Sequence, residues 1–368
     1  MTITEQAMSS LAKRENNKKR SYLVVNPLQG KHVPVSPKAA FEMFGALKDV
    51  LKQVYREEKL LLIGFAETAT AIGAYIAGEL DALYIQTTRE SVENAEFFYF
   101  SEQHSHATEQ KLVKTDLDRA AGQVTRVVFI EDEITTGRTI LNIVRLLRDA
   151  YPGQLQYSAA SLLNGMTEEH EKIYEDQKIR LHFLVKTDHS EYENRVSAYK
   201  EDGVYHTCDS STPSLYVPEY RPSGCLDARR LVQGSAYKEA CRKMCREMAA
   251  LQAVKSGKNI LVLGTEECMY PALCLAWHLE EAGNRVRCHS TTRSPIVVSR
   301  EGAYPLHERY ELTSFYDDSR RTFIYDLAHY DEVFIVTDAK EGKKGLSSLV
   351  HALCSRGNDK IMLVRWCS

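Results

Sequence analysis

The chain has 368 residues, of which 43% are hydrophobic and 26% charged, and its formal net charge is −3. This length allows a full hydrophobic core and favours two domains. The charge provides no footprint for nucleic acid, no apolar run is long enough to span a membrane, and residues 1–19 lack the apolar centre of a signal peptide. The nine cysteines follow no secreted disulfide pattern, so a cytoplasmic protein is expected.

Apolar and amphipathic segments alternate through the first half of the chain. The pattern predicts strands at 22–25, 60–64, 82–86, 124–130, 155–163 and 180–185, and helices at 37–57, 68–79 and 137–151. This alternation indicates an α/β fold with a mostly parallel sheet, whose ligands bind outside the carboxyl ends of the strands. A polar stretch at 188–224, and cysteines that all lie after residue 207, predict a domain boundary near 190–225.

Near the amino end, a segment broken by proline and glycine carries two adjacent cations, Lys31 and His32. As isolated residues, these two are more often solvated loop charges.

The turns after the next two strands also carry polar side chains. Strand 60–64 is followed by Glu67, Thr68, Ala69 and Thr70 at the start of a helix. This turn suits an anion, although Thr68 with Glu67 beside it also fits a simple helix N-cap. Arg89 follows strand 82–86 and provides a fork donor for phosphate, or a surface salt bridge to a nearby glutamate.

An aromatic run at 97–100 precedes a polar stretch that contains His104 and His106. A segment of this kind suits a lid that packs when closed and is solvated when open. The two histidines could instead ligate zinc, but no cysteine or third ligand with zinc spacing lies nearby.

The densest motif is Ile130-Glu131-Asp132-Glu133-Ile134-Thr135-Thr136-Gly137-Arg138-Thr139, at the junction of strand 124–130 and helix 137–151. Backbone N–H groups, threonine hydroxyls and the helix N-terminus converge there on a site suited to a phosphate monoester. Glu131 and Asp132 can face ribose hydroxyls or a hydrated Mg²⁺. The alternative is an ordinary strand–turn–helix with a polar cap.

This motif resembles the signature of the type I phosphoribosyltransferases, and it is neither a Walker loop nor a dinucleotide fingerprint. The resemblance implies a Rossmann-like parallel sheet with a hood and a flexible lid. It also implies that residues 135–139, namely Thr135, Thr136, Gly137, Arg138 and Thr139, hold the 5-phosphate of phosphoribosyl pyrophosphate. Glu131 and Asp132 would bind the ribose hydroxyls and Mg²⁺, and they would stabilise the positive charge that develops at the anomeric carbon.

The same resemblance assigns roles to the other turns. Residues 67–70 and Arg89 would line the pyrophosphate side, the hood with Lys31 and His32 would meet the acceptor, and the lid would bring His104 or His106. The expected reaction is Mg²⁺-dependent phosphoribosyl transfer to a nitrogenous, base-like acceptor that the sequence does not name, or its reverse, by a homodimer. A non-catalytic sensor of phosphoribosyl pyrophosphate is the competing class.

In the second half, Thr292-Arg293-Ser294-Pro295 is the tetrapeptide of the TRSP domain. The whole chain therefore resembles the two-domain phosphoribosyltransferase–TRSP family of bacterial tellurium-resistance and stress gene clusters. The expected division is a phosphoribosyltransferase domain at 20–190, a linker at 191–225 and a TRSP α/β domain at 226–368, with recruitment of a partner protein as one alternative role for the second domain.

The second half also resembles a distant copy of the first. Residues 62–67 parallel 262–267, 87–89 parallel 291–293, and 128–130 parallel 333–335, each of the last pair followed by a glycine seven residues on. The second turn has lost the paired acids and threonines and gained Lys340, Lys343 and Lys344. These parallels predict a second phosphoribosyltransferase-like domain without catalysis, with coincidence of common α/β turns as the alternative.

Overall fold

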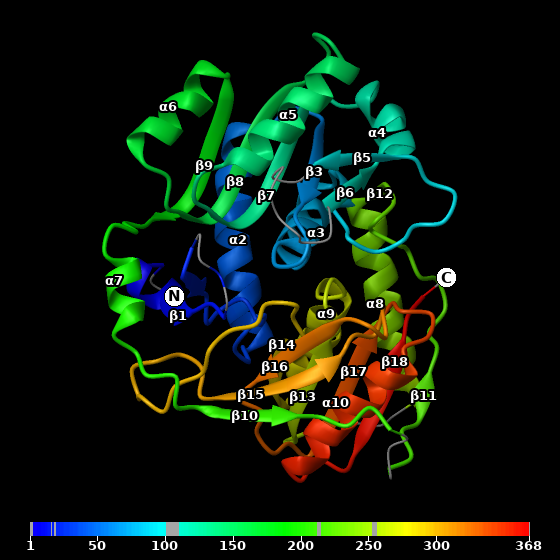
Figure 1. Cartoon of the computed structure of the whole chain (residues 1–368). Helices are drawn as coiled ribbons and strands as arrows, with labels where there is room; N and C mark the ends of the chain where they lie inside the picture. The colour runs from blue at the N-terminus through cyan, green and yellow to red at the C-terminus, as the bar shows by residue number, and fades with distance from the viewer. Residues whose placement is uncertain are drawn as a thin grey trace. The chain divides into compact units, whose positions relative to one another are not determined.

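The computed structural model describes residues 3–15, 17, 20–100, 110–211, 215–251 and 256–367 (Figure 1). The chain forms two compact units that are not contiguous in sequence. Unit 1 comprises Met1–Ala40, Asp188–Cys225 and Cys241–Ser368, and unit 2 comprises Phe41–Thr187 and Leu226–Ala240.

Unit 2 is built on a six-stranded sheet of order β12-β4-β3-β7-β8-β9. All neighbours are parallel except β12, which is antiparallel to β4. The strands are β3 (Leu60–Gly64), β4 (Leu83–Gln86), β7 (Arg126–Ile134), β8 (Gln156–Asn164), β9 (Ile179–Lys186) and β12 (Val232–Gln233). The central strands are almost continuously buried, as expected for a parallel sheet covered on both faces.

Helices and a hairpin complete unit 2. Helix α3 packs on β3, β4 and β7, and Figure 1 shows α5 crossing in front of β7 and β8. The helices are α2 (Pro37–Val54), α3 (Thr70–Leu80), α4 (Lys114–Ala121), α5 (Arg138–Ala150) and α6 (Glu168–Asp176), and the hairpin strands are β5 (Phe97–Phe100) and β6 (Gln110–Val113).

Unit 1 contains a five-stranded parallel sheet of order β11-β18-β17-β13-β14. Its strands are β11 (Glu219–Tyr220), β13 (Asn259–Gly264), β14 (Arg285–Ser290), β17 (Glu332–Thr337) and β18 (Ile361–Arg365). A second sheet joins β10 (Val204–Thr207), β15 (Glu308–Thr313) and β16 (Arg321–Tyr325), and a third joins β1 (Ser10–Lys13) to β2 (Tyr22–Val25). The helices are α1 (Glu5–Met8), α7 (Tyr192–Ser197), α8 (Gly234–Leu251), α9 (Tyr270–Glu281) and α10 (Lys343–Ser355).

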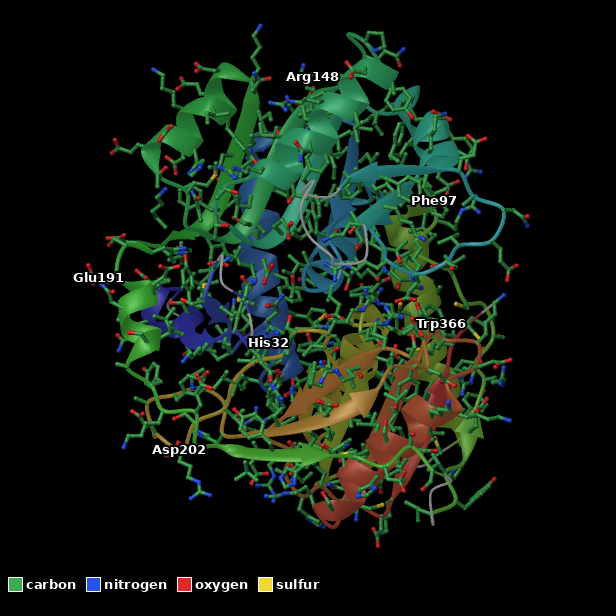
Figure 2. All side chains as sticks on the ribbon, in the orientation of Figure 1. His32, Phe97, Arg148, Glu191, Asp202 and Trp366 are labelled. Carbon is green, nitrogen blue, oxygen red and sulfur yellow. The ribbon has the colours of Figure 1, made fainter. Side chains whose placement is uncertain are left out.

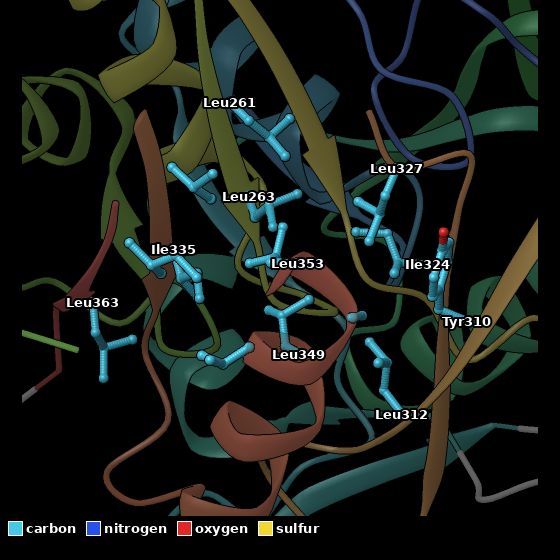
Figure 3. Close-up of a cluster of buried hydrophobic side chains, with 14 of the residues drawn as sticks. Leu261, Leu263, Tyr310, Leu312, Ile324, Leu327, Ile335, Leu349, Leu353 and Leu363 are labelled. Carbon is cyan, nitrogen blue, oxygen red and sulfur yellow. The ribbon is translucent and has the colours of Figure 1, made fainter. Parts of the chain in front are cut away.

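The main core of unit 1 lies between α10 and the strands (Figure 3). Leu349 and Leu353 of α10 pack with Leu263 of β13, Ile335 of β17 and Leu312 of β15. Burial of such side chains contributes about 1.5–3 kcal/mol each, so this cluster is a principal source of the stability of unit 1.

The two units share one topology. The order β4-β3-β7-β8 in unit 2 is repeated as β14-β13-β17-β18 in unit 1, with α3 matched by α9, α5 by α10, and hairpin β5–β6 by β15–β16. The structure corrects the proposed alignment by one residue, because Gly64 pairs with Ile130 whereas Gly264 pairs with Val336. Asp338 is therefore the counterpart of Asp132.

Hydrogen bonds repeat along with the topology. The backbone N–H of Ala66 donates to Oγ1 of Thr87 at 2.8 Å, and that of Glu266 donates to Oγ1 of Thr291 at 3.0 Å. Thr88 and Thr292 each form an antiparallel bridge to the following hairpin, at Lys111 and Phe323. Correspondence at the level of single bonds supports a duplicated domain over a coincidence of common turns.

In each unit, one side of the main sheet is completed by a segment from a distant part of the chain. In unit 2, β12 forms the edge next to β4 and pairs with it through Val232 and Tyr84. In unit 1, Val35 pairs with Cys288 of the edge strand β14. The paired residues Val35 and Val232 each lie two residues before the first residue of a long helix, α2 or α8.

Candidate active site

Three consecutive carboxylates, Glu131, Asp132 and Glu133, stand at the carboxyl end of β7 in unit 2. All three are partly exposed, so a ligand can reach them. Thr68, in the turn after β3, donates its hydroxyl to Oδ1 of Asp132 at 2.8 Å. This bond joins the ends of two neighbouring strands, where ligands of parallel α/β sheets bind.

The carboxylates repel one another, and their partial burial adds to the cost of their charges. Burial, followed by the charges of Asp132 and Glu133, raises the pKa of Glu131 well above its usual range. Burial and then Glu133 also raise the pKa of Asp132, although the Thr68 hydroxyl opposes that rise. Ionisation of these acids is therefore favoured by a bound cation or by hydroxyl donors.

The turn that follows leads directly into α5. Gly137 is the helix N-cap and has a φ of 65°, and the backbone N–H of Arg138 donates to Oγ1 of Thr136 at 3.5 Å. A Cβ at position 137 would lie 2.3 Å from the hydroxyl oxygen of Tyr174, which itself donates to the carbonyl oxygen of Gly137 at 2.9 Å. Left-handed backbone and close packing together require glycine here. Residues 135–139 are partly or fully exposed, so an anion can reach the N-terminus of α5.

The turn after β3 lies beside the carboxylates. It contains Glu67, whose peptide bond with Ala66 is cis, and Thr70, whose hydroxyl donates to the carbonyl oxygen of Glu67 at 3.2 Å. Ala69 is buried as the N-cap of α3. The structure thus brings residues 67–70 together with the 131–139 motif at one edge of the sheet.

Arg89 follows β4 in a turn fixed by two threonines. The Thr87 hydroxyl accepts from Ala66 at 2.8 Å, and the Thr88 hydroxyl accepts from the backbone N–H of Glu90 at 2.9 Å. The 87–90 turn is therefore attached to the 64–67 turn, which places Arg89 on the β3–β4 side of the site.

The remaining predicted residues are not in this site as described. His104 and His106 lie outside the described residues. Lys31 and His32 belong to unit 1, and both are buried there (His32 is labelled in Figure 2). Lys31 Nζ donates to the carbonyl oxygens of Glu266 and Thr291 at 2.8 and 2.9 Å, and burial, followed by the charge of Lys31, lowers the pKa of His32 to about 3. The two residues are therefore interior groups of unit 1. The Lys31 ammonium donates to backbone carbonyl oxygens of that unit, and the lowered pKa keeps His32 neutral.

The corresponding turns of unit 1 are filled by the protein itself. Glu266 and Glu267 are buried, and Arg293, at the position equivalent to Arg89, contacts them at 2.8 and 3.3 Å. Arg320 lies 3.7 Å from Glu266. These ion pairs lie in the turns that correspond to residues 66–67 and Arg89 of unit 2.

The loop of the β15–β16 hairpin packs onto the helix turn in unit 1. A Cβ at Gly342, the N-cap of α10, would lie 2.6 Å from the carbonyl oxygen of Phe315. Tyr316 donates its hydroxyl to Asp338 and to the carbonyl oxygen of Thr265. In the degenerate copy, the hairpin loop therefore packs over the turn that has lost the paired acids and threonines.

Two residues near the site of unit 2 were missed in the sequence. Tyr174, on α6, packs against Gly137, and Arg229 donates to the Thr88 hydroxyl at 3.2 Å. Both contacts are long-range, so no local pattern indicates them.

No helix in the described stretches has the length and apolar content that a bilayer crossing needs.

Two family models match the chain. A phosphoribosyl transferase model matches residues 8–190, and a model of the TRSP domain that follows that domain matches residues 230–353. No curated protein is significantly similar in sequence.

Several solved structures resemble about half of the chain. Adenine phosphoribosyltransferase from Rhodothermus marinus is 17% identical with a TM-score of 0.37, over 50% of this chain and 96% of that one. The Trypanosoma brucei enzyme, in complex with AMP, pyrophosphate and ribose-5-phosphate, is 17% identical with a TM-score of 0.36, over 50% and 77%. Orotate phosphoribosyltransferase from Aeropyrum pernix is 15% identical with a TM-score of 0.33, over 51% and 93%. These low TM-scores leave the assignment to the family models and to the geometry of the site.

Proposed function

The chain belongs to the two-domain phosphoribosyltransferase–TRSP family, and from this premise we propose that unit 2 transfers the phosphoribosyl group of phosphoribosyl pyrophosphate to a nitrogenous, base-like acceptor, or catalyses the reverse. The observation that carries the proposal is the 2.8 Å bond between Thr68 and Asp132. It joins a pyrophosphate-side turn to the ribose-side carboxylates, beside the open N-terminus of α5.

Each element of the site has one task in this reaction. The 135–139 turn binds the 5-phosphate through its backbone N–H groups and hydroxyls. Glu131 and Asp132 accept hydrogen bonds from the ribose hydroxyls and stabilise the positive charge that develops at the anomeric carbon. Arg89 and residues 67–70 contact the departing pyrophosphate, whose negative charge Arg89 offsets.

The carboxylates also suit Mg²⁺. Oxygen ligands whose pKa values are raised by burial and mutual repulsion are stabilised in their ionised form by a hard divalent cation. Glu131 and Asp132 would hold the ion, which supplies charge neutralisation for the pyrophosphate leaving group.

Calorimetric titration with Mg²⁺ and phosphoribosyl pyrophosphate tests the proposal. Thr136→Val/Thr139→Val should abolish binding that the wild-type chain shows. The matched control, Glu341→Ala/Lys344→Ala, changes positions equally distant from the N-cap glycine of α10 and should bind as the wild type does. Absence of binding to the wild-type chain would refute the proposal.

Turnover is measured next as pyrophosphate release in the presence of a panel of nitrogenous bases. Release that depends on one base identifies the acceptor. Tight binding without release by any base or from the donor alone would favour a sensor over an enzyme.

A further inference from the structure

Unit 2 includes a short segment from beyond the phosphoribosyltransferase match, residues 226–240. Its β12 pairs with β4, and the carbonyl oxygen of Ala228 accepts from the backbone N–H of Gln86 at 2.8 Å. The segment therefore runs beside the end of β4, where the turn carrying Arg89 begins.

Arg229 is the residue of this segment that reaches the turn. Its side chain is buried, its Nε donates to the Thr88 hydroxyl at 3.2 Å, and its Nη1 lies 3.4 Å from Asp227. The same Thr88 hydroxyl accepts from the backbone N–H of Glu90. One oxygen thus connects Arg229 to the residues on both sides of Arg89.

Unit 1 provides an independent parallel. There the edge segment before α2 sends the Lys31 ammonium to the carbonyl oxygens of Glu266 and Thr291. Glu266 and Thr291 lie in the turns equivalent to those of Ala66 and Thr87 in unit 2. In both copies, a buried cation from the edge segment therefore bonds to the turn after the strand that the segment flanks, at the Thr291 carbonyl oxygen in unit 1 and at the Thr88 hydroxyl in unit 2.

We propose that Arg229 is a positioning residue for the pyrophosphate side of the active site, so that residues 226–240, which lie beyond the phosphoribosyltransferase match, are a working part of the transferase. Arg229 holds the 87–90 turn in the geometry that directs Arg89 toward the pyrophosphate. The inference rests on the proposed function, since it presumes that unit 2 binds phosphoribosyl pyrophosphate.

The test separates the two ends of the donor. Full-length wild-type, Arg229→Met and Arg229→Lys chains are titrated with Mg²⁺-pyrophosphate and, separately, with ribose 5-phosphate. Arg229→Met should weaken pyrophosphate binding on the order of tenfold, as loss of one charged hydrogen bond predicts, and leave ribose 5-phosphate binding unchanged. Arg229→Lys should restore part of the loss.

Arg230 provides a matched control in the next position. It makes two bonds, of 2.6 and 3.1 Å, to the buried Asp116, which belongs to α4 and not to the 87–90 turn. Arg230→Met should lower the melting temperature without changing the ratio of the two affinities. Thr88→Val removes the acceptor without touching the arginine, and it should reproduce the selective loss if Arg229→Met does not fold.

Equal weakening of both ligands, or unchanged pyrophosphate binding in Arg229→Met and Thr88→Val, would overturn the positioning role while leaving the proposed function intact. A wild-type chain that binds neither ligand would overturn both.

Discussion

The turns at the carboxyl ends of the strands have opposite electrostatics in the two units. In unit 2, Glu131, Asp132 and Glu133 repel one another and raise the pKa values of Glu131 and Asp132. In unit 1, Glu266 and Glu267 are paired with Arg293, and the loop at Phe315 and Tyr316 packs onto the N-terminus of α10. The comparison shows that one fold can leave its charge for a ligand to neutralise or neutralise it internally, and only the first arrangement suits catalysis.

The largest contrast is expected between Arg293→Met and Arg89→Met. The first leaves two buried carboxylates without their main partner, which should lower the free energy of unfolding of unit 1 by about 3–5 kcal/mol. Both tryptophans, Trp277 and Trp366, lie in unit 1, so tryptophan fluorescence during urea unfolding reports on that unit. Arg89→Met should leave this transition in place and weaken pyrophosphate binding instead; an equal shift in both variants would contradict the contrast.

Asp132→Asn and Asp338→Asn compare the aligned acids. Loss of the charge that stabilises the transition state should lower pyrophosphate release by about 10²–10³-fold in Asp132→Asn, with a smaller effect on donor binding. Asp338 accepts from Tyr316 in the closed turn, so Asp338→Asn should leave release unchanged. If turnover and donor affinity fall equally in Asp132→Asn, charge stabilisation is not its main role.

The two N-cap glycines sharpen the comparison further. Gly137→Ala and Gly342→Ala each force a side chain into left-handed backbone and a close contact, so each should destabilise its unit by about 1–3 kcal/mol. Only Gly137→Ala should also weaken ribose 5-phosphate binding, as calorimetry would measure. Loss of that binding in Gly342→Ala would contradict the view that the hairpin loop of unit 1 keeps ligands from the turn before α10.

The smallest expected effect is a dependence on pH. Because the pKa of Glu131 is raised in the free protein, a proton must leave when Mg²⁺ and the donor bind. Affinity should therefore rise with pH, by at most about tenfold per pH unit for each proton released, until the raised pKa is passed. Stability has the opposite sign, since the folded state holds this proton at pH values where the unfolded state has lost it. Glu131→Gln should flatten the dependence of affinity on pH. The slope that remains would come from titration of the donor itself.

The sequence predicts much of the site because its information is local. The 131–139 motif, the 67–70 turn and Arg89 each lie directly after an apolar strand, and parallel strands place their carboxyl ends along one edge. Lys31 and His32 show the limit of this reasoning. Their surroundings depend on Val35 pairing with Cys288, which lies far along the chain, and no local pattern encodes such a pairing. Arg229 was missed for the same reason, since β12 has only two residues and pairs with a distant strand.

The long-range pairings of β12 with β4 and of Val35 with β14 have a consequence for biosynthesis. While the chain emerges from the ribosome, β4 has no outer neighbour until residues 232 and 233 are made, although the rest of its sheet is complete by residue 186. The first forty residues, in turn, wait for β14 at residues 285–290. An open parallel edge is a template for unwanted pairing, so nascent chains pass through a period of aggregation risk that ends only when the second half arrives. Chains truncated near residue 190 should remain in that state permanently.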